Sequence, residues 1–156
     1  MSLVKAIAVG VILAATVLAA DPFVGTWKLD VGKSKLREPS NFTGGLTITI
    51  EAAGENTLHF AYDRVAAATQ EKGQNTTSGT LTFDGKPQPM PTEQGATRTP
   101  ERIDEHHFRV TFAKDGKPLQ TQEGSVSTDG RILTMTIKGA GGTGKSLDVL
   151  EVFQRQ

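Results

Sequence analysis

The chain has 156 residues, and its 17 basic side chains balance 17 acidic ones, so the formal net charge is zero. This balance gives no electrostatic basis for binding nucleic acid or an anionic membrane. The absence of cysteine excludes disulfide scaffolds, cysteine-ligated zinc and thiol catalysis. The length suits a single domain, and 20 threonines with 17 glycines favour β-structure.

The first 20 residues have the pattern of a secretory signal peptide. Lys5 supplies the positive charge, residues 6–18 form a continuous run of apolar or small residues, and Ala19-Ala20 offer a cleavage site. A membrane-spanning helix needs ~20 apolar residues, which is longer than this run. We therefore expect residues 1–20 to be removed and residues 21–156 to form one secreted or periplasmic domain without a membrane span. An uncleaved N-terminal anchor is the alternative.

Short segments of alternating apolar and polar residues follow in chain order, separated by turn signals such as Asp84-Gly85 and Asp115-Gly116. This period of two predicts antiparallel strands. They are expected near residues 24–30, 44–51, 57–64, 76–83, 96–103, 107–114, 119–127, 131–138 and 147–155. Only residues 65–71 offer a short helix. Two segments are predicted to be irregular: residues 31–42, and the proline-rich residues 87–91, which are expected to be extended and unable to donate to a sheet ladder.

About nine successive strands in one domain must either close or stack. Closure removes exposed sheet edges, so the pattern predicts an all-β fold, an antiparallel up-and-down β-barrel of about 8–10 strands. An outer-membrane barrel is disfavoured because the second face of most strands carries Thr, Lys, Arg, Glu and His rather than lipid-facing apolar residues.

The two ends of this predicted barrel carry a recognisable pair of motifs. Gly25-Thr26-Trp27 lies in the first strand, and Arg155 lies near the end of the last. This arrangement resembles the lipocalin and fatty-acid-binding (calycin) superfamily, and the opening with Lys33-Ser34-Lys35 is similar to uncharacterised secreted bacterial lipocalin-like proteins. The resemblance implies a lipocalin-like barrel in which the Trp27 indole closes one end and Arg155 packs across it. Gly25, Trp27 and Arg155 are therefore assigned structural roles. An ordinary core position for Trp27 is the alternative.

The apolar side chains that should point into the barrel are the leading candidates for function. They are Phe60, Tyr62, Phe83, Phe108, Phe112 and Met135. They either fill a small barrel completely or leave a cavity for one small ligand. The leading hypothesis is a secreted or periplasmic binding protein that holds a small, mostly apolar molecule at these six residues, with no cofactor and no metal.

Two other classes of function remain open. A barrel-cavity enzyme of the isomerase or cyclase type would need polar groups in the cavity, such as Tyr62, Glu101 or Arg102. No residue is assigned a catalytic role, and enzymatic activity stays uncertain. A protein-interaction module with a solid core would instead bind through residues 87–91 or the basic segment Lys33–Arg37.

Several further motifs have plainer interpretations. Residues 139–146 match the phosphate-loop pattern, but only ten residues follow Ser146, so the helix of a nucleotide-binding unit has no room. A glycine-rich hairpin loop is expected there. His59, His106 and His107 are expected at the surface, without a shared metal. The resemblance suggests that an interior arginine could meet an acidic ligand group, but alternation places Arg109 outside.

Overall fold

The computed structural model describes residues 20–37, 45–64, 76–91, 93–141 and 144–156. These residues form ten β-strands and one short 3-10 helix, η1 (Val31–Lys33). The strands are β1 (Gly25–Leu29), β2 (Leu46–Gly54), β3 (Thr57–Arg64), β4 (Thr76–Thr82), β5 (Gln88–Pro89), β6 (Ala96–Asp104), β7 (His107–Lys114), β8 (Lys117–Val126), β9 (Ile132–Ala140) and β10 (Ser146–Arg155). Among the described residues, no helix has the length and apolarity that crossing a membrane requires.

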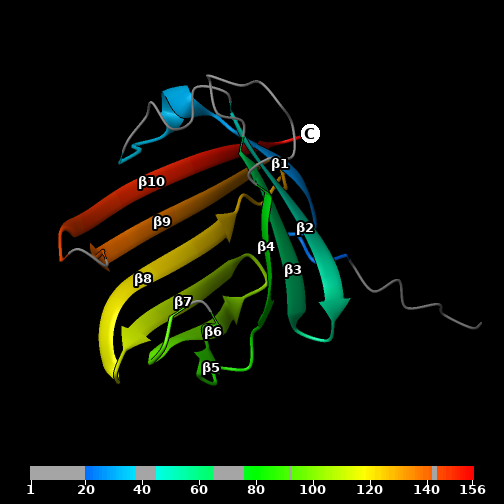
Figure 1. Ribbon diagram of the computed structural model, residues 1–156. Helices are drawn as coiled ribbons and strands as arrows, with labels where there is room; N and C mark the ends of the chain where they lie inside the picture. Colours follow the sequence, from blue (N-terminus) through cyan, green and yellow to red (C-terminus); the bar gives the residue numbers. More distant parts are fainter. Residues whose placement is uncertain (1–19, 38–44, 65–75, 92, 142–143) are drawn as a thin grey trace, which may run out of the picture.

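All ten strands belong to one antiparallel sheet, in the order β4-β3-β2-β1-β10-β9-β8-β7-β6-β5. The first strand pairs with the last, and Trp27 lies opposite Arg155 in this pair. The sheet therefore curls until its two chain ends lie side by side, as Figure 1 shows for β1 and β10. This confirms the predicted all-β, antiparallel barrel-type fold.

The two ends of the strand order, β4 and β5–β6, are joined by side chains rather than by a ladder. The Arg98 guanidinium donates from Nη2 to the Thr80 carbonyl at 2.9 Å. The Gln88 amide donates from Nε2 to the Thr82 carbonyl at 2.6 Å. We call this junction the β4–β6 boundary. Among the described residues, no strand ladder crosses it.

The strands lie close to the predicted positions. One further strand, β5, corrects the prediction. Within the segment expected to be irregular, Gln88 and Pro89 pair with Arg98 and Thr97 of β6. The prolines lack an N–H, but Met90 retains one and donates it to the Ala96 carbonyl at 3.0 Å. The N–H of Met90, which lies between two prolines, is therefore enough to help hold this two-residue strand against β6. The helix considered at residues 65–71 lies outside the described residues.

The glycine-rich segment that matches the phosphate-loop pattern joins β9 to β10. Its ends belong to these two strands, and Gly141 donates its N–H to the Lys145 carbonyl at 2.8 Å across the turn. Residues 142–143 lie outside the described residues. The strand on each side makes this segment a hairpin loop, as expected from the sequence.

Alternation along the strands sends one set of side chains into the barrel. Leu46, Ile48 and Ile50 of β2 are at most 4 % exposed. The inward face of β8 carries Gly124, over which the Phe108 ring packs so closely that a Cβ there would lie 2.3 Å from the ring carbons. The apolar core lies mainly toward the end of the barrel that Trp27 closes, and includes Phe23, Phe83, Leu133, Met135 and Phe153.

Candidate functional site: a cavity in one half of the barrel

The closed end of the barrel is built around an indole and a guanidinium. The Arg155 guanidinium carbon lies 4.1 Å from the centre of the Trp27 ring, a distance at which a cation and an aromatic face attract each other. The same guanidinium donates to the carbonyls of Val24, Pro22 and Gly130. The Trp27 Nε1–H donates to the Phe23 carbonyl at 2.9 Å, which satisfies the indole. The end is therefore held by hydrogen bonds as well as by packing.

Gly25 is the third member of this group. Its φ of +148° disfavours any side chain, and a Cβ there would lie 2.4 Å from Arg155 Nη1. The guanidinium can reach the carbonyls around it only because this position carries no side chain. Gly25, Trp27 and Arg155 thus form one contact unit that closes the barrel.

A second arginine, which the sequence analysis considered for the barrel interior, is partly buried in the same half. Arg102 of β6 forms an ion pair with Asp21 at 2.5 Å. Its guanidinium carbon lies 5.1 Å from the Phe23 ring centre and 4.8 Å from that of Phe83. Its charge is paired and stacked on two rings, while its Nη1 is buried without a hydrogen-bond partner.

The other half of the barrel interior contains a cavity of about 170 Å³. Side chains of β3, β4, β6, β7 and β8 line it: Phe60, Tyr62, Thr77, Ser78, Leu81, Arg98, Phe112 and Gln122, together with Gly79. Because Ser78 and Arg98 lie on facing strands at the β4–β6 boundary, the cavity reaches the barrel wall there. Its lining combines three aromatic rings with a small number of polar groups, as is typical of small-molecule sites.

The six residues predicted to hold a ligand divide into two groups. Phe60, Tyr62 and Phe112 line the cavity. Phe83, Phe108 and Met135 lie in the packed core and are at most 6 % exposed, and the rings of Phe83 and Phe108 are 5.2 Å apart. The sequence left open whether these side chains fill the barrel or leave a cavity. The structure shows both, a packed core in one half and a cavity in the other.

Polar side chains accompany these rings. Arg98 and Gln122 line the cavity. Glu151 lies on β10 directly opposite the buried Met135 of β9, so it shares the inward side of the sheet. An even spacing from Ala96 through Arg98 and Pro100 to Arg102 was the available signal for β6. It is weak because neither Ala nor Pro marks a buried face clearly.

Burial changes the protonation of two of these groups. It raises the pKa of Tyr62 to about 12, with the charge of Glu151 adding to the rise and that of Arg98 opposing it. The Tyr62 hydroxyl therefore stays protonated and can donate a hydrogen bond at any physiological pH. Burial also raises the pKa of the Glu151 carboxyl, and the nearby charge of Arg64 opposes this rise.

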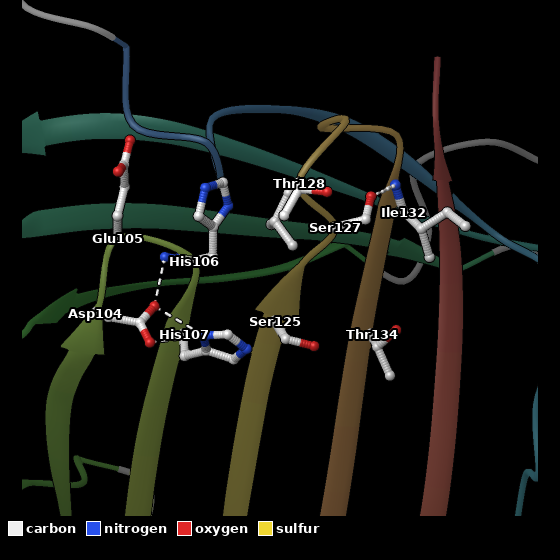
Figure 2. A pocket seen from close by; sticks show the side chains of 10 residues that line it. Asp104, Glu105, His106, His107, Ser125, Ser127, Thr128, Ile132 and Thr134 are labelled. Carbon is white, nitrogen blue, oxygen red and sulfur yellow. Dashed lines mark hydrogen bonds and ion pairs between the residues drawn. The ribbon is translucent and has the colours of Figure 1, made fainter.

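A larger pocket, of about 600 Å³, lies on the outer surface at the turns that follow β6 and β8 (Figure 2). His107 and Ser125 face outward there, since they alternate with the buried Phe108 and Val126. Asp104 accepts from His107 Nδ1 at 2.7 Å and from the His106 backbone N–H at 2.8 Å. The hydrogen bond from His107 lowers the pKa of the Asp104 carboxyl. The backbone bond is that of a tight turn, so Asp104 shapes the β6–β7 hairpin.

The neighbouring turns hold several of the polar side chains of this outer pocket. No cluster of three or more His, Asp or Glu side chains suited to a metal occurs among the described residues. Ser127 is engaged in the β8–β9 turn, where its hydroxyl contacts Asp129 and accepts the Ile132 N–H. His59 likewise lies on the outer face, 3.2 Å from the Thr80 hydroxyl.

The residues considered for an enzyme are not brought together. Tyr62 lines the cavity, and Arg102 is paired at the closed end. Glu101 lies opposite Arg109 in the β6–β7 ladder, and the exposed Arg109 donates to Glu123 on the outer face at 2.9 Å. Arg109 is thus outside the barrel, as alternation predicted.

The segments considered for protein binding are both attached to the barrel. Residues 88–89 form β5. Lys35 exchanges backbone hydrogen bonds with Leu150 of β10, and its ammonium pairs with Asp148. Neither segment stands away from the wall as a separate docking element.

Comparison with known proteins shows the fold and leaves the family open. No protein-family model matches the chain, and no curated protein matches it. Among solved structures, it is similar to a mutant of the fluorescent protein UnaG, with a TM-score of 0.58 and 14% identity over 87% of this chain and 97% of that one. It is also similar to fatty-acid-binding protein 1 of Echinococcus granulosus, with a TM-score of 0.56 and 14% identity over 87% of this chain and 98% of that one.

A third neighbour is the zebrafish ileal bile acid-binding protein complexed with cholic acid, with a TM-score of 0.55 and 13% identity over 86% of this chain and 99% of that one. The class of fold is therefore the calycin-type β-barrel. In this chain, the fold has ten strands in one antiparallel sheet.

Proposed function

We propose that this chain is a secreted or periplasmic, lipocalin-like binding protein that holds a small, mostly apolar molecule in its barrel. The observation that carries the proposal is the cavity of about 170 Å³ lined by Phe60, Tyr62 and Phe112. Phe112 also lines a second space of about 150 Å³, together with Met90, Ala96 and Gln120. Burying apolar ligand surface at ~25 cal/mol per Å² would drive binding.

The cavity also limits the size of the ligand. Sites for drug-sized molecules measure roughly 300–1,000 Å³. The fatty-acid and bile-acid binding proteins named above have the same fold, and this supports a ligand in the barrel rather than any particular ligand. The smaller space here favours a compact molecule that reaches Phe60 and Phe112 without displacing Phe83 or Phe108.

Export is the second part of the proposal. Ala20 is exposed, whereas Asp21 and Phe23 belong to the closed end of the barrel. Cleavage after Ala20 would keep every contact of that end intact. When the full-length chain is expressed in a bacterium, we expect material outside the cytoplasm whose intact mass corresponds to residues 21–156. An intracellular protein with residues 1–20 still attached would contradict export.

Binding is tested by native mass spectrometry of protein purified from its own host, which should show a bound small molecule. A panel of lipids, terpenoids and small aromatic compounds should then raise the melting temperature. Gly79→Leu should abolish this shift, because an inward leucine at Gly79 fills the cavity. Thr49→Leu, at an outward position of β2, is the matched control. A clean apo mass together with no shift from any compound would reject the proposal.

A further inference from the structure

We propose a further activity on the outer surface of the barrel: the hydrolysis of small neutral esters, with Ser125 as nucleophile and His107 as general base. Asp104 is the residue that positions His107. The site lies in the outer pocket, on the face of the sheet away from the barrel interior, so it is independent of the binding function proposed above. It is built from one row of side chains that four neighbouring strands bring together.

The register of the sheet creates this row. Asp104, the last residue of β6, is paired with His107 of β7. His107 lies directly opposite Ser125 of β8, and Ser125 lies opposite Thr134 of β9. Residues that face each other on neighbouring strands have Cβ atoms about 4.5–5.5 Å apart, so their side chains can interact. A carboxylate, an imidazole and a hydroxyl thus follow one another in the order that serine hydrolases use.

The contact between the carboxylate and the imidazole is one that orients a base. The Oδ1 and Oδ2 atoms of Asp104 lie 2.7 and 2.9 Å from His107 Nδ1. A neutral imidazole that donates from Nδ1 to a carboxylate has Nε2 free to accept a proton. Figure 2 shows the ring extending from Asp104 toward Ser125, so Nε2 lies on the side of the serine. The carboxylate also stabilises the positive charge that His107 acquires when it takes the proton.

Ser125 differs from Ser127, the other serine that lines the outer pocket. The Ser127 hydroxyl is held by the β8–β9 turn. The Ser125 hydroxyl makes no hydrogen bond with any of the described residues, and is therefore available to a base. Rotation about χ1 moves Oγ between staggered positions. The hydrogen bond between nucleophile and base is often long in a free enzyme and tightens when the substrate binds.

The reaction that this row supports is acyl transfer. Ser125 Oγ attacks the carbonyl carbon of the ester and its proton passes to His107 Nε2, while the carbonyl oxygen becomes an oxyanion. The Thr134 hydroxyl, on the other side of Ser125, is the donor placed to stabilise this oxyanion. The bond to the alcohol oxygen then breaks, and His107 returns the proton to the leaving alcohol. Water hydrolyses the acyl-serine in the same way, giving a proton to His107 that returns to Ser125 as the acid departs.

Two pockets on the outer surface place a substrate beside the row. The outer pocket of about 600 Å³ and a second pocket of about 290 Å³ share the side chains of His107, Ser125 and Thr134. Ile132 lines the first pocket and Ile103 the second, and these side chains are 37 % and 52 % exposed. Each pocket therefore offers apolar surface to one side of an ester, the acyl group or the alcohol.

The charges around the row favour an uncharged substrate. Asp104 and Glu105 line the outer pocket, and none of the described residues that line it is a lysine or an arginine. The second pocket contains Arg109, but its guanidinium donates to the Glu123 carboxylate. An ester that carries a carboxylate or phosphate would meet like charge without a free cation, whereas a neutral ester would not.

Covalent labelling tests the nucleophile directly. Diisopropyl fluorophosphate phosphorylates a serine hydroxyl that a neighbouring base activates. After incubation with this reagent, the purified protein should gain the mass of one diisopropylphosphoryl group, and peptide mapping should place it on Ser125. Ser125→Ala and His107→Gln should each abolish the label. Absence of the label, or a label on another residue, would overturn the assignment of the nucleophile.

Turnover of 4-nitrophenyl acetate measures the base and its partner. Ser125→Ala and His107→Gln should each lower kcat/KM by about 100-fold or more, because a positioned base contributes ~10²–10⁴-fold. The double variant should lose no more than either single variant, since the two groups act as a unit. Asp104→Asn keeps an acceptor for the His106 N–H, and it should lower kcat by about tenfold or more with KM nearly unchanged.

The control addresses the weak esterase activity of any exposed imidazole. His59→Gln removes a histidine of the outer face that lines neither pocket, and it should change the rate by less than about twofold. An equal loss from His59→Gln and His107→Gln, with no loss from Ser125→Ala, would reduce the activity to ordinary imidazole catalysis and overturn the proposal. The mono-4-nitrophenyl ester of glutaric acid, which carries a carboxylate, should react more slowly than 4-nitrophenyl butyrate. The reverse order would overturn the preference for neutral esters. Circular dichroism confirms that each variant folds.

Discussion

The two halves of the barrel interior differ in how completely side chains fill them. At the closed end, Phe23, Trp27 and Phe153 have no exposed surface, and the two inward arginines are tied to an aspartate or to carbonyls. In the other half, Tyr62 and Phe112 are only partly buried, and both line a cavity of about 170 Å³. Stability is therefore concentrated where packing is complete, and the space proposed to hold a ligand lies where packing stops.

This contrast explains why a small barrel can contain a cavity at all. Eight to ten strands enclose a space that side chains can just fill. A cavity in one half is tolerated because the aromatic cluster of the other half supplies the buried area, with ring centres of Phe23 and Phe108 only 4.9 Å apart. The sharpest way to test the contrast is to remove comparable side chains from the two halves.

The largest expected effect is that of Trp27→Ala. It removes a fully buried indole, its hydrogen bond to the Phe23 carbonyl and the surface on which Arg155 stacks. We expect the free energy of unfolding to fall by ~3–5 kcal/mol. Phe112→Ala, in the half-buried cavity wall, should cost roughly half of this or less, because part of the ring already faces empty space. Urea denaturation measures both, and equal losses would show that the two halves do not differ in packing.

Gly124→Ala should have the next largest effect. The added methyl group would lie 2.3 Å from carbons of the Phe108 ring, which is fixed by three neighbouring rings. Overpacking of this kind costs ~1–3 kcal/mol. Gly32→Ala, where the nearest atom is at an ordinary 3.5 Å, is the control. Adding Phe108→Leu should remove the penalty of Gly124→Ala in a double-mutant cycle, and additive losses would exclude this contact as its cause.

A pH-dependent effect is expected in the cavity half, and it is the smallest of the three. Burial raises the pKa of Glu151 in the folded state above its value of 4.5 in the unfolded chain. The folded state thus binds the proton more tightly, and the stability this provides is present below pH 4.5 and is lost as the pH rises through the folded pKa. Glu151→Gln should therefore raise the melting temperature at pH 7 and have little effect at pH 4. An equal change at both pH values would contradict this assignment.

Alternation in the sequence was sufficient to predict most of the fold. It identified the inward faces of β2 and β7, because Leu46, Ile48, Phe108 and Val110 alternate with polar residues. The pairing of the first and last strands followed from the need to remove sheet edges. In β10, however, Leu147, Val149 and Phe153 share a face with Glu151, and apolar residues also occupy the opposite face. The pattern there cannot reveal that a carboxyl points inward.

The cavity was beyond the reach of sequence analysis for a related reason. Whether Phe60 and Phe112 touch other rings or face empty space depends on whether the inward side chains fill the volume that the curled strands enclose. No pattern in the sequence records that comparison of volumes. The inward position of Arg98 was equally hidden, since its neighbours on that face are Ala96 and Pro100. The residues that distinguish the cavity from the core are those whose neighbouring sequence indicates least clearly which way they face.

The pairing of β1 with β10 determines when the barrel can form during synthesis. Arg155 donates to the Val24 carbonyl across 131 positions of the chain. Contacts so distant in sequence form late, because most of the chain must be ordered before they add stability. Until β10 has been made, β1 therefore has only one of its two partner strands, β2, and the ring closes only when β10 pairs with it.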